Sequence, residues 1–154
     1  MTPFKGRRED PRLLTGKGTY TSDCNLPGQL HAVFVRSDRA HAKILKIDTS
    51  VAAKAPGVRA VLDAQSIAAA RLKRLQPLVA YPGRGGMKII VPDRPALAHG
   101  RVRYVGEAVA LVIADSPNAA LSATELVAVD YEDLPAVIGV DRARESGTIA
   151  WETL

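Results

Sequence analysis

Short apolar runs, separated by polar and Gly/Pro-containing breaks, dominate the chain between residues 26 and 141. The run at residues 108–114, Ala-Val-Ala-Leu-Val-Ile-Ala, is rich in β-branched residues and predicts a buried strand. Residues 30–35 are apolar on both faces apart from His31, which predicts a central strand. Further strands are predicted at residues 42–48, 58–62, 101–105, 127–134 and 137–140.

The breaks between the earlier strands predict two short helices. Ser50 is expected to cap a helix that continues to Ala55 and ends at Pro56-Gly57. Asp63 begins a second helix along residues 65–72, where the many alanines favour helical backbone.

A third helix follows the apolar run. Ser116 is a suitable N-cap, and Pro117 suits the first helical position because its fixed φ matches the helix and its missing N–H is not needed there. Strands that alternate with short helices predict an α+β fold around a mixed β-sheet.

Three segments lack an apolar pattern. Residues 1–25 are polar and predicted to be irregular, and residues 142–154 form a polar tail. Residues 76–100 carry eight prolines and glycines and predict a long loop, of the kind that binds something or is ordered by its neighbours. A single domain is therefore expected at residues 26–141.

Composition is that of an ordinary globular chain of 154 residues. Its longest apolar run is too short to span a bilayer, and residues 1–10 show no secretory pattern. Cys24 is the only cysteine, which excludes an internal disulfide and fits a reducing compartment. We expect a cytoplasmic location.

The net charge of +5 is unevenly distributed. Residues 1–116 hold 19 Lys/Arg and 9 Asp/Glu, whereas residues 117–154 hold 2 and 7. The basic residues occur singly or in pairs without interleaved aromatic residues, which disfavours nucleic-acid binding. Solvated faces and contacts with an acidic partner are the better interpretation.

Candidate metal ligands are few. His31, His41, His99 and Cys24 are the only imidazoles and thiol. His31 and His41 approach each other only if their strands pair, and two imidazoles do not make a metal site without further ligands. Hydrogen-bonded histidines at strand positions are expected instead.

Glu107 is the carboxylate of most interest because it stands at the entrance to the buried strand. A carboxylate there needs solvent or a partner, and Arg101 and Arg103 are close in sequence, so a structural ion pair is favoured over catalysis. Glu132 and Asp133 are adjacent strand residues that point to opposite faces, so they do not form a catalytic pair.

The glycine-rich segments do not complete a phosphate loop. Gly16-Lys-Gly18 lacks a preceding strand, and Gly83-Arg-Gly-Gly86 precedes no predicted helix. Turn and flexible-loop roles are expected for them. From the residues alone, no catalytic, cofactor-binding or metal-binding residue is assigned.

A set of short phrases follows one another along nearly the whole chain. They are Arg8-Glu-Asp-Pro-Arg-Leu-Leu-Thr-Gly-Lys-Gly-Thr-Tyr20, Leu26-Pro-Gly28, His31-Ala-Val-Phe-Val-Arg-Ser37, His41-Ala42 with Ile44, Pro56-Gly-Val58, Val105-Gly-Glu107 and Leu134-Pro135. In order and spacing they resemble the large, molybdopterin-binding subunit of the molybdenum hydroxylases, the xanthine dehydrogenase, aldehyde oxidase and carbon monoxide dehydrogenase family. Departures are Asp38-Arg39 where Pro-His is usual and Ala108 where Pro is common.

The resemblance implies an α/β-hammerhead domain at the amino-terminal end of that subunit. It further implies an oxidoreductase that hydroxylates an aldehyde, an N-heterocycle or carbon monoxide with oxygen from water. Its partners would be the remaining molybdopterin-binding domains and the FAD and iron–sulfur subunits. The family's catalytic glutamate and pterin-contacting motifs have no counterpart here, so the resemblance transfers no site residue.

Two hypotheses remain open at this point. The chain is either the scaffold domain of such a subunit or a stand-alone binding or assembly module that kept the fold without the catalysis. For the scaffold domain we expect apolar surface that the rest of the subunit would cover, and hence weak self-association as a two-fold dimer. A strict monomer would favour the stand-alone module.

Overall fold

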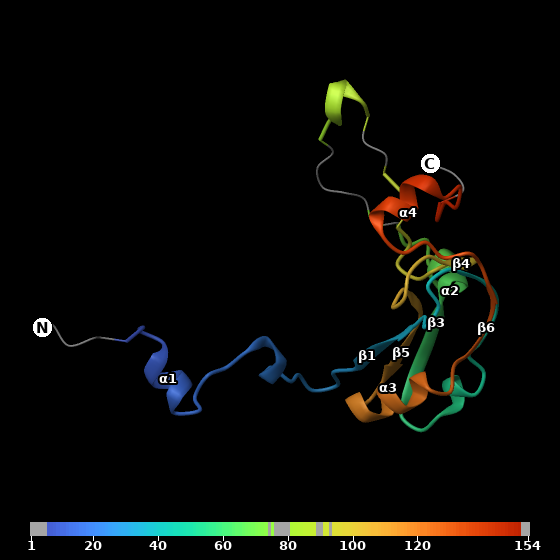
Figure 1. Ribbon diagram of the computed structural model, residues 1–154. Coiled ribbons are helices and arrows are strands. Elements are labelled where there is room, and N and C mark those ends of the chain that lie inside the picture. The colour runs from blue at the N-terminus through green and yellow to red at the C-terminus, as the bar shows by residue number, and fades with distance from the viewer. Residues whose placement is uncertain (1–5, 74, 76–80, 89–90, 93, 152–154) are drawn as a thin grey trace, which may run out of the picture.

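The computed structural model describes residues 6–73, 75, 81–88, 91–92 and 94–151. Two three-stranded sheets form its body, with short helices around them (Figure 1). All strand pairs that it describes are antiparallel. The α+β prediction is confirmed, and the strands expected in one mixed sheet are divided between two small ones.

The first sheet, sheet A, has the order β1-β5-β3. Its central strand is β5 (Ala108–Ala114), which pairs with β1 (His31–Arg36) on one side and β3 (Val58–Asp63) on the other. The apolar run was therefore correctly predicted as a buried strand. The prediction of a central strand at residues 30–35 was wrong, because β1 is an edge strand.

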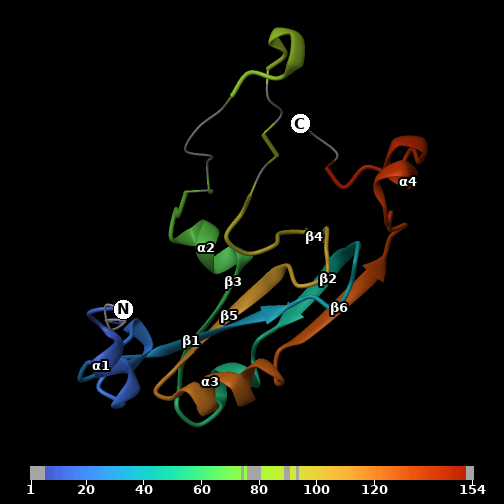
Figure 2. The ribbon, with the colours of Figure 1, turned by 60° about the vertical axis from the view of Figure 1, so that its left-hand side comes forward.

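The second sheet, sheet B, has the order β4-β2-β6. Its central strand β2 (Ala42–Asp48) pairs with the two-residue β4 (Arg101–Val102) and with β6 (Ala128–Asp133). Figure 2 shows β2 and β6 running side by side beyond β5.

Helix α3 (Pro117–Thr124) covers one face of sheet A and closes the main core. Ser116 caps it as predicted, its Oγ accepting a hydrogen bond from the Ala119 backbone at 3.2 Å. Ala120 and Ala123 are buried, and Ala123 packs against Val112 of β5. Small residues let the helix approach the sheet closely.

A second buried cluster joins sheet B to the start of β5. Its members are Ala42, Ala98, Val102 and Val109. Val35, Ile47 and Val129 pack against both clusters, so the two sheets share one continuous core.

The helix after β3 was predicted correctly at its start. α2 (Ala64–Ala69) begins behind Asp63, whose carboxylate accepts hydrogen bonds from the backbone and hydroxyl of Ser66. The predicted Ser50 cap was wrong. Its hydroxyl instead donates to Asp48 at 2.6 Å, and only a 3₁₀ turn, η2 (Ala52–Lys54), follows.

The outer segments contain more regular structure than expected. Helix α1 (Asp10–Leu14) and the 3₁₀ turn η1 (Thr21–Asp23) occur in the segment predicted to be irregular. Pro11 does not break α1, because it lies in the first turn, where no N–H is needed. This segment extends away from the sheets (Figure 1).

Near the other end, helix α4 (Val140–Glu145) replaces the strand predicted at residues 137–140, which was wrong. Gly139 precedes it with φ 95°, a left-handed conformation that breaks a strand and that glycine adopts without strain.

In the long loop, the described part includes a 3₁₀ turn, η3 (Arg84–Gly86), held by a hydrogen bond from the Gly83 N–H to the Met87 carbonyl at 2.7 Å. Leu97 and Ala98 near its end are buried. Residues 76–80, 89–90 and 93 of the predicted loop lie outside the described residues. Among the helices that the structure describes, none has the length and apolar character needed to cross a membrane.

Candidate functional site

The two strand histidines are not brought together. His31 lies on β1 of sheet A and His41 immediately precedes β2 of sheet B, and these strands do not pair. A two-histidine site would have required these two strands to pair, so the structure does not form one from His31 and His41.

His41 instead attaches the segment that follows β6 to sheet B. Its Nδ1 lies 2.8 Å from the Pro135 carbonyl, and its own carbonyl accepts from the Leu134 N–H at 2.9 Å. Because a carbonyl only accepts, Nδ1 must carry the proton. The buried Nε2 has no hydrogen-bond partner among the described residues. This structural role matches the expectation of a hydrogen-bonded histidine.

Glu107 interacts with Arg103, in agreement with the predicted structural ion pair. Its carboxylate accepts the Arg103 backbone N–H at 2.6 Å, and the Arg103 guanidinium lies 3.9 Å away. The residue is 7% exposed. Burial raises the pKa of Glu107, and the Arg103 N–H and positive charge partly offset that rise. The carboxylate thus closes a tight turn into β5.

The Arg103 side chain also holds residues 150–151. Its Nε donates to the Ala150 carbonyl at 3.1 Å, and its guanidinium lies over the Trp151 ring, 4.0 Å from the centroid. Nothing local in the sequence indicates this contact, which joins residues 48 positions apart. Arg103 and His41 also line a cavity of about 480 Å³, whose other walls come mainly from residues 135–150.

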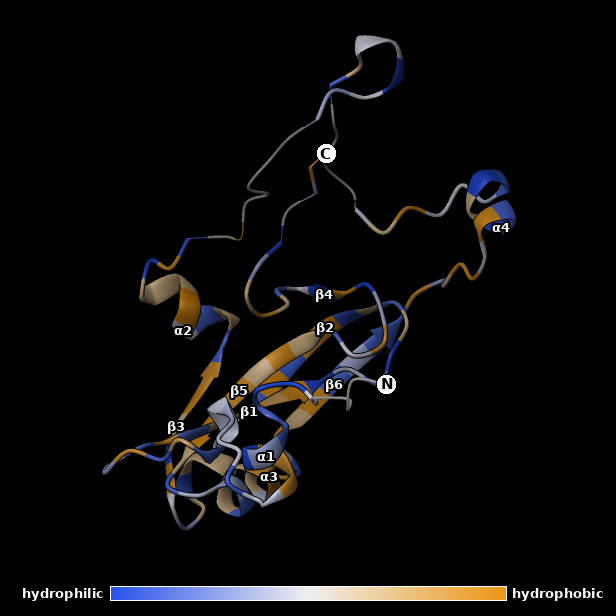
Figure 3. Ribbon diagram, turned by 90° about the vertical axis from the view of Figure 1, so that its left-hand side faces the viewer, coloured by the Kyte–Doolittle hydropathy of each residue, from blue (hydrophilic) through white to orange (hydrophobic). Residues whose placement is uncertain are grey.

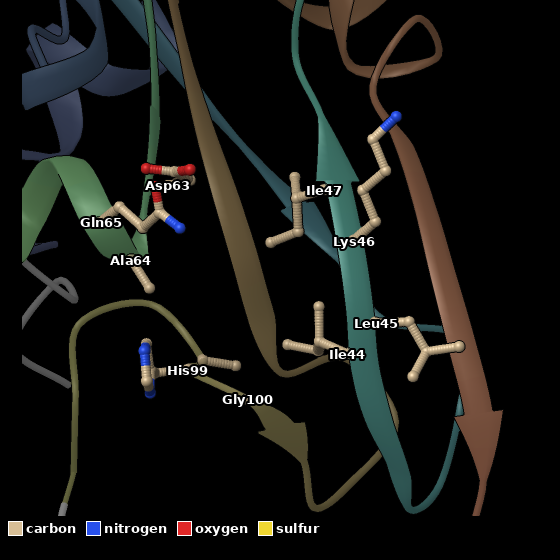
Figure 4. Close-up of a pocket in the computed structure, with 10 residues that line it drawn as sticks. Ile44, Leu45, Lys46, Ile47, Asp63, Ala64, Gln65, His99 and Gly100 are labelled. Carbon is tan, nitrogen blue, oxygen red and sulfur yellow. The ribbon is translucent and has the colours of Figure 1, made fainter.

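A cavity of about 310 Å³ lies between β2 and the start of α2 (Figure 4). Ile44 and Ile47 point into it from β2, and Asp63 and His99 lie on the opposite side. The Asp63 carboxylate already accepts the Ser66 hydrogen bonds that cap α2. Burial acts to raise the pKa of Asp63, but the Ser66 hydrogen bonds hold it below its usual range. Besides the apolar residues of β2, the lining therefore includes the polar residues Lys46 and Gln65 and the exposed imidazole of His99.

The other candidate residues are dispersed. Glu132 pairs with Lys43 at 2.9 Å and Asp133 with Arg39 at 3.5 Å, so the two carboxylates serve separate cations. Cys24 is exposed. Within the described ranges, no three His, Cys, Asp or Glu side chains converge on a common point. No chemical step is assigned to these residues.

A family model described as "Aldehyde oxidase and xanthine dehydrogenase, a/b hammerhead domain" matches residues 15–135. Among curated proteins, the nicotine 6-hydroxylase large subunit of Paenarthrobacter nicotinovorans is 42% identical over 144 residues. The carbon monoxide dehydrogenase large chain of Afipia carboxidovorans is 40% identical over 139 residues.

Solved structures give the same result. The quinoline 2-oxidoreductase of Pseudomonas putida 86 matches with a TM-score of 0.81 and 42% identity over 96% of this chain. The aldehyde oxidoreductase of Desulfovibrio gigas matches with a TM-score of 0.76 and 34% identity over 93%.

All of these similar proteins are much longer. The chain spans 17% of the nicotine 6-hydroxylase subunit and 16% of the carbon monoxide dehydrogenase chain, although 94% and 90% of its own residues align. The match covers 18% of the quinoline 2-oxidoreductase chain and 16% of the aldehyde oxidoreductase chain.

Proposed function

Because the chain belongs to the aldehyde oxidase and xanthine dehydrogenase family, as its α/β-hammerhead domain, we propose that it is the amino-terminal scaffold domain of a molybdenum hydroxylase's molybdopterin-binding subunit. One observation carries the proposal: 94% of this chain aligns with a hydroxylase large subunit, but the aligned part is only 17% of that subunit. Such a match is typical of one domain within a longer functional unit.

The complete enzyme would hydroxylate an aldehyde, an N-heterocycle or carbon monoxide, with water as the oxygen source. Molybdopterin, iron–sulfur clusters and FAD would supply the redox chemistry from domains or subunits outside this chain. We assign this chain no catalytic, cofactor-binding or metal-binding residue. Its contribution is to present a rigid framework and to fix the path of the polypeptide beside it.

Several contacts support the framework role. The shared core joins the two sheets, and the His41–Pro135 and Arg103–Ala150 hydrogen bonds attach the segment after β6 to them. We propose residues 26–141 as the hammerhead domain proper, preceded by a linking segment at residues 1–25. Residues 142–154 would then be the connection that follows it.

Partners and location follow from the same proposal. The remaining molybdopterin-binding domains and the FAD and iron–sulfur subunits would be the partners, and nucleic acid would not. The single cysteine fits a reducing compartment and supports a cytoplasmic location. Weak self-association of the isolated chain stays a prediction, tested by sedimentation at low and high ionic strength.

The reading frame and the native protein provide the decisive test. We expect the frame, or an adjacent gene, to encode the pterin-binding domains, and residues 1–154 to co-purify with molybdenum when isolated from the source cells. A frame that ends after this chain without such a neighbour, together with a native protein free of molybdenum, would favour the stand-alone assembly module.

A further inference from the structure

Helix α3 covers one face of sheet A, whereas the other face is buried at Val109, in the second cluster, and only partly covered beyond it. The structure places α3 and the buried residues Ala52 and Ala123 against the face that carries Val112. The side chains one position away along β5, Leu111 and Ile113, point to the opposite face, because neighbouring strand residues alternate.

Strand register defines the rest of that opposite face. Ile113 lies opposite Ala32 on β1 and Ala60 on β3, and Leu111 lies opposite Phe34 and Leu62. Directly opposed residues in an antiparallel pair share a face. We call these six residues the bare face: Ala32, Phe34, Ala60, Leu62, Leu111 and Ile113.

All six residues of the bare face are apolar. Phe34 is 44% exposed, and Ala32 is exposed as well. At the edge of this face the Arg36 guanidinium lies over the Phe34 ring, 5.4 Å from its centroid, and donates to the Gly106 carbonyl at 2.8 Å. Hydrophobic colours also predominate along β3 and β5 in Figure 3.

A face of this composition is unusual for a sheet in contact with water. Antiparallel sheets with one solvated face show polar residues at alternate positions, whereas strands covered on both faces have continuous apolar runs. β5 has the second pattern, Ala-Val-Ala-Leu-Val-Ile-Ala. Its sequence therefore suits a strand covered on both sides.

We propose that the bare face packs against the part of the large hydroxylase subunit that lies outside residues 1–154. This inference rests on the proposed function. In similar proteins the matched segment is only 16–18% of the chain, so a covering domain of the same polypeptide is available.

Effective concentration favours this occupant over a second copy of the chain. A domain in the same polypeptide is present at an effective concentration on the order of millimolar, which a free second copy in a cell does not reach. The apolar character of the face also fits a permanent contact, because such interfaces resemble a divided domain core. The buried face would then become the main hydrophobic contact between this domain and its neighbour.

Photo-crosslinking in the native protein tests the proposal. A benzophenone amino acid placed at position 34 should give crosslinked peptides from the pterin-binding sequence. The matched control is position 121, because Leu121 is 58% exposed and lies on α3, the helix that covers the other face. We expect no such peptides from position 121.

A substitution pair gives an independent measurement. Phe34→Lys should abolish co-purification of residues 1–154 with the pterin-binding part when the two are produced as separate pieces, and Leu121→Lys should not. Circular dichroism of both variants must match the wild type, and Phe34 tolerates a polar replacement because it is partly exposed on an edge strand.

The outcomes separate this inference from the proposed function. If the pterin-binding sequence is encoded beside or after this chain, but position 34 crosslinks to a second copy or to nothing, the bare-face proposal is overturned and the function stands. If the genes contain no pterin-binding sequence, the proposed function fails first. Crosslinks from position 34 to that sequence, absent from position 121, support both.

Discussion

The guanidinium of Arg103 lies over the ring of Trp151, 4.0 Å from its centroid, while the Arg103 backbone N–H donates to the buried Glu107 carboxylate. One arginine therefore links the turn before β5 to the segment after α4. A cation over an indole face is attracted by the ring's quadrupole, and the attraction is strongest where water is excluded.

We predict that Trp151→Ala lowers the free energy of unfolding by about 1 kcal/mol through loss of this cation–π contact. Urea denaturation followed by circular dichroism measures the change. Trp151→Phe is the control, because a smaller ring keeps part of the attraction. Equal stability of Trp151→Ala and the wild type would show that the contact is not formed in solution.

Glu107 gives a prediction about pH. Burial raises the pKa of Glu107 in the folded protein, so the folded state prefers the protonated carboxyl. Its contribution to stability therefore improves as the pH falls through that raised pKa, and is least favourable at neutral and higher pH.

In Glu107→Gln the amide oxygen still accepts the Arg103 N–H, so we expect a folded protein that lacks this part of the pH dependence. Glu107→Ala leaves that N–H without its acceptor and should cost about 1–3 kcal/mol. Unfolding curves of both variants between about pH 4 and pH 8, a range that starts near the ordinary carboxyl pKa and extends well above it, provide the comparison. A Gln variant with an unchanged pH profile would contradict the assignment.

The contribution of Asp63 to stability should depend on pH in the opposite direction to that of Glu107. Its pKa is lowered in the folded protein by the Ser66 hydrogen bonds, so its stabilisation is present above the carboxyl's ordinary pKa and is lost as the pH falls through the lowered value. Asp63→Asn keeps an N-cap acceptor but does not titrate, and Asp63→Ala should cost about 1 kcal/mol.

Acid denaturation followed by circular dichroism distinguishes the Asp63 variants. The Asn variant is expected to lose less stability than the wild type on acidification, although both begin near the same value at neutral pH. If the Ala variant were as stable as the wild type at neutral pH, the cap of α2 would have no energetic role.

A substitution at Val112 tests whether this residue lies in the hydrophobic core of the folded protein. It is fully buried between β1 and β3, and a carboxylate there would have no partner, so we expect Val112→Asp to unfold the domain. Leu121→Asp places the same charge on an exposed position of α3 and should remain folded. Far-ultraviolet circular dichroism of the two purified variants checks this. A folded Val112→Asp protein would require a different core.

Local chemistry explains what could be predicted from the sequence. Ser116 and Asp63 cap helices through bonds to backbone three residues away, and the run containing Val112 is a buried strand whatever its neighbours. β1 was misplaced because its apolar residues on two faces were attributed to a central position, whereas one of those faces is the bare face. The Arg103–Trp151 contact depends on the folded path of the chain, which no short pattern encodes.

The order of strands along the chain has a consequence for synthesis on the ribosome. β1 and β3 both pair with β5, and β2 pairs with β4 and β6, so none of the first three strands can pair with another of them. Roughly 70 residues therefore separate the start of β1 from the first pairing partner, β4, which takes several seconds at about 5–20 residues per second. During that interval the nascent chain carries up to three unpaired strands, whose exposed apolar side chains and free strand edges favour aggregation.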